Sequence, residues 1–201
     1  MESSNRLKSS PRRQLLSGVN MFFAILPDDE AKAEIIRIGE RFVKTHRLGS
    51  SAVDFERLHV TVAPVGKPDR LQQPLESALI AAGDAVQMHC FDVTLDSAMR
   101  FSHQAEDGRF PFVLCADAPT IQSALSLRRS LADAQYAQGL LVAGVSSYLP
   151  HVALLHGRGI DRVEQRIPPI SWTAREFVLV RSYFDQFRYE IMARWPLAPA
   201  A

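Results

Sequence analysis

Two histidines, His59 and His151, each begin a short apolar run typical of a β-strand. Side chains alternate between the two faces of a strand, so His59, Thr61 and Ala63 are expected to share one face of the first run. In the second run, His151 and Ala153 share a face in the same way. The first run therefore places an imidazole and a hydroxyl about 7 Å apart along a strand, and the second repeats the pattern without the hydroxyl.

Paired imidazoles suit the opening of a cyclic phosphodiester. That reaction needs a base to deprotonate water and an acid to protonate the departing ribose oxygen. Imidazole, with an unperturbed pKa of about 6.5, can serve in either role near neutral pH. Thr hydroxyls and backbone N–H groups can stabilise charge on the non-bridging oxygens. No metal or other cofactor is required, and a zinc site on the two histidines would lack a third ligand at useful spacing. The alternative is that each histidine is a hydrogen-bonded structural residue.

The elements that would carry these histidines repeat along the chain. Each half has an apolar strand, a helix and a strand beginning with histidine, and is closed by glycine. Phe23 precedes His59 by 36 residues, and Val113 precedes His151 by 38. Two similar units could agree by chance, but the match favours an internal duplication. It predicts an α+β fold in which duplicated β-α-β units form two antiparallel-sheet lobes around a central cleft, with helices on the outside.

The boundaries follow from periodicity and from Gly and Pro stops. Residues 1–18 are polar and aperiodic, which predicts a disordered lead before a single bilobal domain over residues 19–201. The lobes are expected at about residues 19–100 and 110–197, with some strands free to cross over. Strands are expected at residues 19–26, 58–65, 88–99, 112–116, 151–155, 172–183 and 188–195, and helices at residues 28–48, 70–82 and 120–138.

Composition narrows the class of protein. The chain has 201 residues, 47% of them hydrophobic, and a net charge of +1, which does not favour binding to long nucleic acids. The two cysteines lie in apolar runs and are interpreted as reduced thiols of an intracellular protein. No secretory signal or apolar segment of membrane-spanning length is present. A cytoplasmic monomer is expected.

Several segments together resemble the two-histidine phosphoesterase superfamily, most closely its bacterial 2′-5′ RNA ligase group, also described as RNA 2′,3′-cyclic phosphodiesterases. The resemblance covers nearly the whole chain from Asn20. It is carried by the opening strand and helix start at residues 21–28, by the two His-x-Thr/Ser-x signatures at residues 57–62 and 150–155, and by the closing strand pair at residues 177–182, 188–190 and 194–197.

The resemblance implies a fold with a cleft between two lobes, and a catalytic pair of His59 and His151. Thr61 would hold the phosphate oxygens, and the substrate would be an RNA terminus or small oligonucleotide bearing a cyclic phosphate. The reverse reaction would be 2′-5′ RNA ligation. The departure is Ala153, where the family has Thr or Ser, because a methyl group cannot hydrogen-bond phosphate. The alternatives are a nucleotide- or RNA-binding module with lapsed catalysis, or a phosphodiesterase for another 2′-linked nucleotide.

Three further residues are candidates for binding the substrate. His156 follows His151 by five residues, and strict alternation would turn it to the other face unless a bulge redirects it. Tyr148 could stack on a base or pack locally. Arg181 could reach a phosphate of an oligonucleotide or pair with a nearby acid.

Overall fold

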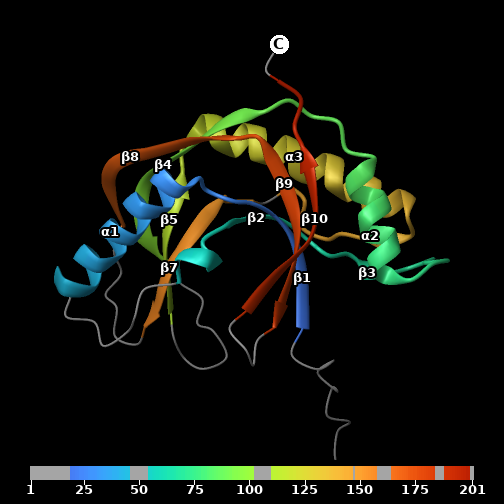
Figure 1. Cartoon of the computed structure of the whole chain (residues 1–201), viewed down its shortest axis with the longest axis horizontal. Helices are drawn as coiled ribbons and strands as arrows, with labels where there is room; N and C mark the ends of the chain where they lie inside the picture. Colours follow the sequence, from blue (N-terminus) through green and yellow to red (C-terminus); the bar gives the residue numbers. More distant parts are fainter. Residues whose placement is uncertain are drawn as a thin grey trace, which may run out of the picture.

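In the part of the chain that the structure describes, eight antiparallel strands form one sheet (Figure 1). The computed structural model describes residues 19–45, 54–101, 110–146, 148–157, 164–183 and 188–199, so the predicted lead at residues 1–18 lies outside the described residues. The elements are β1 Val19–Ile25, α1 Asp29–Thr45, the 3-10 helix η1 Phe55–Arg57, β2 Val60–Pro64, β3 Lys67–Pro68, α2 Leu75–Asp84, β4 Phe91–Arg100, β5 Phe110–Ala116, α3 Ala118–Ala137, β6 Leu140–Leu141, β7 His151–Gly157, β8 Glu164–Ala174, β9 Glu176–Tyr183 and β10 Arg188–Pro196. The predicted α+β class is confirmed.

The strand order is β10-β9-β1-β2-β7-β5-β4-β8, with the contact between β2 and β7 at its centre. A single residue pair, Val60 with Val152, joins these two strands. The expected lobes are therefore the two halves of one sheet. β4 lies in the sequence range of the first lobe but pairs with β5 and β8, whereas β9 and β10 complete the first half beside β1.

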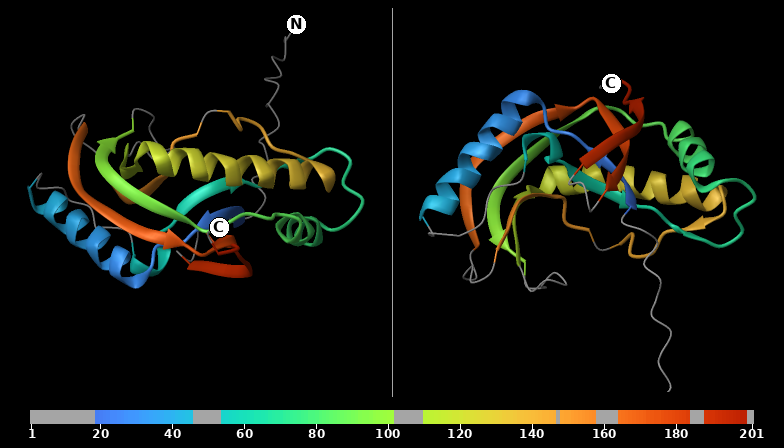
Figure 2. Two further views of the ribbon diagram at one scale, coloured as in Figure 1. Left: turned by 90° about the horizontal axis from the view of Figure 1, so that it is seen from above. Right: turned by 60° about the horizontal axis from the view of Figure 1, so that its bottom comes forward.

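The long helices tie the two halves together. α1 follows β1 of the first half but lies against β7 and β8 of the second, and α3 follows β5 but lies against β2 as well as β4. Asp28 and Asp117 start these helices, because their carboxylates accept hydrogen bonds from the N–H groups of Ala31 and Thr120. Figure 2 shows α3 spanning the molecule between the ends occupied by α1 and α2.

Apolar side chains occupy both faces of the sheet, but unequally. The main core lies on the face covered by the helices and includes the fully buried Phe23, Phe112 and Phe177. A smaller cluster lies on the opposite face of the first half; its members are Phe22, Ala24, Val178 and Val180, with Leu26 and Tyr189 packed against it. We call this opposite face the open face.

Most predicted bounds agree with the structure to within three residues, and two elements differ by more. α2 begins at Leu75 instead of residue 70, because the residue before Pro74 is disfavoured in helical conformation, whereas proline suits the start of a helix. The strand expected at residues 172–183 is two strands, β8 and β9, which meet at Arg175. Among the described residues, no helix is long and apolar enough to cross a membrane.

Candidate active site

His59 and His151 lie on the open face at the two central strands. The residues that follow them, Val60 and Val152, pair across β2 and β7 and are buried in the main core. Because side chains alternate along a strand, both imidazoles point to the other face, where each is half-buried.

The register makes the two imidazoles diagonal neighbours. In an antiparallel pair that aligns Val60 with Val152, Thr61 lies opposite His151 and Ala153 lies opposite His59. Diagonal side chains across such a pair are about 7–8 Å apart. The charge of His151 contributes to lowering the pKa of His59, as expected for close neighbours. The structure thus brings together the two histidines and the threonine that the sequence singled out.

A β-bulge follows each histidine at the same distance. The pairing of β2 with β1 skips Val62, and the pairing of β7 with β5 skips Leu154. Each extra residue interrupts the alternation of the strand. Ala63 consequently lies in the main core, so the expectation that it shares a face with His59 is wrong. The two halves of the sheet therefore share a bulge at the same position after the histidine.

The bulge on β7 also sets the direction of His156. Leu154 and Leu155 are both buried, and His156 is half-buried again. The bulge returns His156 to the open face, the face on which His151 lies. Strict alternation would have turned His156 to the opposite face. On β2 the corresponding position, five residues after His59, is Pro64.

Each imidazole is oriented by a backbone carbonyl two residues earlier. Nδ1 of His59 lies 2.7 Å from the Arg57 carbonyl oxygen, and Nδ1 of His151 lies 2.8 Å from that of Leu149. A carbonyl only accepts hydrogen bonds, so Nδ1 carries the proton in each ring. In the neutral ring, Nε2 is then the proton acceptor. Nε2 of His59 lies 3.1 Å from Oγ1 of Thr61, whose hydroxyl donates to it.

His59 is held in its neutral form. Burial of the ring is the largest cause and lowers the pKa of His59 to about 4, with smaller contributions from the charges of His151 and Arg57. The hydrogen bond to the Arg57 carbonyl acts in the opposite direction. A neutral imidazole with an unprotonated Nε2 can accept a proton from a hydroxyl or from water.

Aromatic rings that the sequence analysis did not single out surround the two imidazoles. The rings of Phe22 and Tyr189 have centroids 4.8 and 5.3 Å from that of His59. The ring of Phe101 meets that of His151 edge-on at 4.7 Å. These rings come from β1, from β10 and from the residue that follows β4, so their association depends on strand pairing that local sequence patterns do not encode.

Tyr148 lies beside Thr61. Its hydroxyl donates to the carbonyl oxygen of Thr61 at 2.6 Å, and the guanidinium of Arg128 lies 4.8 Å from its ring centroid. The hydroxyl is thus engaged by the backbone of β2, and one face of the ring is covered by a cation.

Arg181 is not brought to the imidazoles. It neighbours Val180 on β9, which belongs to the open-face cluster, so alternation points Arg181 to the opposite face. There its guanidinium pairs with Glu76 of α2 and with Glu190 of β10.

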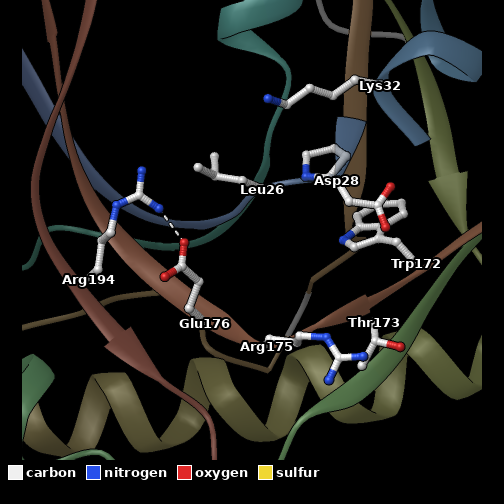
Figure 3. A pocket seen from close by; sticks show the side chains of 9 residues that line it. Leu26, Asp28, Lys32, Trp172, Thr173, Arg175, Glu176 and Arg194 are labelled. Atoms are coloured by element: carbon white, nitrogen blue, oxygen red, sulfur yellow. Dashed lines mark hydrogen bonds and ion pairs between the residues drawn. The ribbon is translucent and has the colours of Figure 1, made fainter. Parts of the chain in front are cut away.

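A hollow of about 420 Å³ lies between the β1–α1 turn and the β8–β9 turn (Figure 3). Leu26 lines it, with Lys32 and Arg175 on opposite sides and Arg194 paired with Glu176. Neither imidazole lines this hollow. The candidate site is therefore the open face at β2 and β7. The described residues contain no group of three His, Cys, Asp or Glu side chains placed to hold a metal ion.

Known proteins share this sequence pattern and this fold. A model of the 2′-5′ RNA ligase superfamily matches residues 27–185. E. coli LigT in its apo form has a TM-score of 0.63 and 25% identity, over 90% of this chain and 99% of LigT. LigT complexed with phosphate has a TM-score of 0.59 and 26% identity, over 89% of this chain and 97% of LigT. TT0787 of Thermus thermophilus shares the fold, with a TM-score of 0.62 and 19% identity over 90% of this chain and 100% of TT0787. No curated protein matches the sequence significantly.

Proposed function

Because this chain belongs to the 2′-5′ RNA ligase superfamily, and because two imidazoles meet at the centre of its sheet, we propose that it opens 2′,3′-cyclic phosphate ends of RNA or short oligonucleotides. The proposed enzyme is a metal-independent phosphodiesterase that leaves a 2′-phosphate. The crystallisation of LigT with phosphate supports a phosphate-bearing substrate. The observation that carries the proposal is the diagonal placement of His59 and His151, each with Nδ1 tied to a carbonyl, so that Nε2 is the atom that would transfer the proton.

We assign the base to His59 and the acid to His151. Nε2 of His59 takes a proton from water while the water oxygen attacks the phosphorus. The bond from phosphorus to the ribose O3′ breaks, and His151 in its protonated form gives a proton to that oxygen. The lowered pKa of His59 suits the base role, since the ring is unprotonated near neutral pH. If an RNA 5′-hydroxyl takes the place of water, the same transfers form a 2′-5′ phosphodiester.

The non-bridging oxygens of the phosphate need hydrogen-bond donors as charge develops on them. Thr61 is the first candidate, because its hydroxyl lies next to Nε2 of His59. When substrate binds, this hydroxyl would turn from Nε2 to a phosphate oxygen, which leaves Nε2 to accept the proton of the attacking water. His156 is the second, because the bulge on β7 turns it to the same face. Ala153 supplies no donor, although it lies opposite His59 at the position that corresponds to Thr61.

The methyl group of Ala153 favours one competing function, a nucleotide- or RNA-binding module that has lost turnover. A module of this kind would bind a cyclic nucleotide without converting it. Binding without product formation by the wild-type protein would support this alternative.

The decisive experiment uses a 2′,3′-cyclic nucleotide and a short RNA with a cyclic phosphate end, both in EDTA, with identification of the product. We expect a 2′-phosphate, and a loss of at least about 10²-fold with either His59→Ala or His151→Ala. His89→Ala is the matched control, because the backbone of His89 pairs with Ala198 away from β2 and β7. Turnover that disappears with the chelator, or that survives both substitutions, would contradict the proposal.

A further inference from the structure

The bulge on β2 is held by two side chains from outside the strand. The carbonyl oxygen of Thr61 accepts a hydrogen bond from the hydroxyl of Tyr148 at 2.6 Å, and that of Val62 accepts one from Nη1 of Arg128 at 2.8 Å. A bulge leaves its extra residue outside the regular ladder of hydrogen bonds, and one residue pair alone joins β2 to β7. The two carbonyls therefore lie at and beside an interruption of the ladder, where fewer hydrogen bonds of the sheet restrain the backbone.

Arg128 reaches the bulge from a buried position, and burial of its charge is unfavourable in free energy. Arg128 is 8% exposed, and no carboxylate among the described residues pairs with its guanidinium. Burying a guanidinium without a carboxylate is unfavourable unless hydrogen bonds compensate. Here its second terminal nitrogen donates to the Gly144 carbonyl at 3.0 Å, and its charge lies over the Tyr148 ring. Arg128 thus joins α3, the segment before β7 and the bulge on β2.

We infer that Arg128 and Tyr148 are positioning residues that fix the bulge on β2 and thereby aim the Thr61 hydroxyl at the phosphate. Both act on carbonyl oxygens of the strand, and Tyr148 acts directly on Thr61. The inference rests on the proposed function. It gives Tyr148 a role through its hydroxyl and leaves stacking on a base as a competing role, which would act through its ring.

The test is a double-mutant cycle of Tyr148→Phe with Thr61→Ala. Tyr148→Phe removes only the hydroxyl and keeps the ring beneath Arg128. We expect kcat to fall about 10-fold with KM changed less than about 2-fold, because the hydroxyl of Thr61 is misaimed at the transition state. In the Thr61→Ala background, the same substitution should lower kcat less than about 2-fold, since no hydroxyl remains to be positioned. Tyr136→Phe, which changes an exposed tyrosine on α3, is the matched control and should leave kcat unchanged.

Three other outcomes would contradict the inference. Equal losses in both backgrounds would show a general structural role, and a silent Tyr148→Phe with a raised KM in Tyr148→Leu would show a substrate contact through the ring. Arg128→Lys keeps the charge but cannot bridge the carbonyls of Val62 and Gly144, so a wild-type rate in that variant would also overturn the inference.

If the wild-type protein binds inorganic phosphate but opens no cyclic phosphate, the proposed function fails and the inference is tested by binding. The affinity for inorganic phosphate would then be measured in the four proteins of the cycle. The same coupling is expected: Tyr148→Phe weakens binding in the presence of Thr61 and not in its absence. Equal effects in both backgrounds would overturn the inference.

Discussion

Replacing Ala153 with threonine should accelerate the opening of the cyclic phosphate. Ala153 follows His151 by two residues on the open face, as Thr61 follows His59. The Thr61 hydroxyl lies 3.1 Å from Nε2 of His59, so a hydroxyl at position 153 is expected near Nε2 of His151. A hydrogen bond from that hydroxyl to a charged phosphate oxygen is worth roughly 1.5–3 kcal/mol, or about 10- to 150-fold in kcat/KM.

The assay is the steady-state rate on a 2′,3′-cyclic nucleotide in EDTA, with the product identified. Ala153→Val is the matched control, because valine has nearly the shape of threonine and no hydroxyl. Strand propensity should change little between them, since both residues are β-branched. We expect kcat/KM of Ala153→Thr to exceed that of Ala153→Val by at least about 10-fold.

Equal rates in the two variants would refute the reasoning, because the hydroxyl at position 153 would then not reach the phosphate. A large gain from an undetectable wild-type rate would instead identify the chain as a lapsed enzyme whose site is still assembled.

Three further predictions concern pH, substrate binding and packing. The pKa of His59, followed by NMR of the ring, should be about 4. Because this pKa is below the unfolded value of 6.5, the unfolded state binds the proton more readily than the folded state. The contribution of the neutral ring to stability is therefore complete above pH 6.5 and is lost as the pH falls toward 4. Denaturant unfolding should show up to about 3 kcal/mol of this pH dependence, which His59→Ala should remove; an unchanged slope would refute it. His156→Ala should lower kcat/KM about 10-fold, and an unchanged rate would show that His156 does not touch the phosphate. Gly83→Ala should lower stability by about 1–3 kcal/mol in thermal or denaturant unfolding, because the new Cβ would lie 2.2 Å from the Trp195 ring; the gain that alanine usually brings to a helix would be the contrary result.

The sequence by itself determined the local elements and the side chains that each offers. Strand alternation around His59 and His151, glycine stops and the apolar spacing of α1 and α3 are properties of short segments, so they can be recognised without tertiary contacts. The repeat of the two units, together with the resemblance to the two-histidine phosphoesterases, predicted the fold class and the association of the two imidazoles. The side of the strand on which Thr61 lies was predicted for the same reason.

The tertiary structure alone decided those details of the site that depend on the register with a partner strand. The bulges at Val62 and Leu154 exist only relative to β1 and β5, and they are the reason that Ala63 is buried and that His156 is turned to the open face. The low pKa of His59 comes from burial beside rings that other strands supply. Arg128 lies within an ordinary helical pattern in the sequence, and its burial beneath the bulge on β2 became visible only once α3 and β2 were in contact. Strand pairing joins residues far apart along the chain, and local periodicity contains no information about which of them meet.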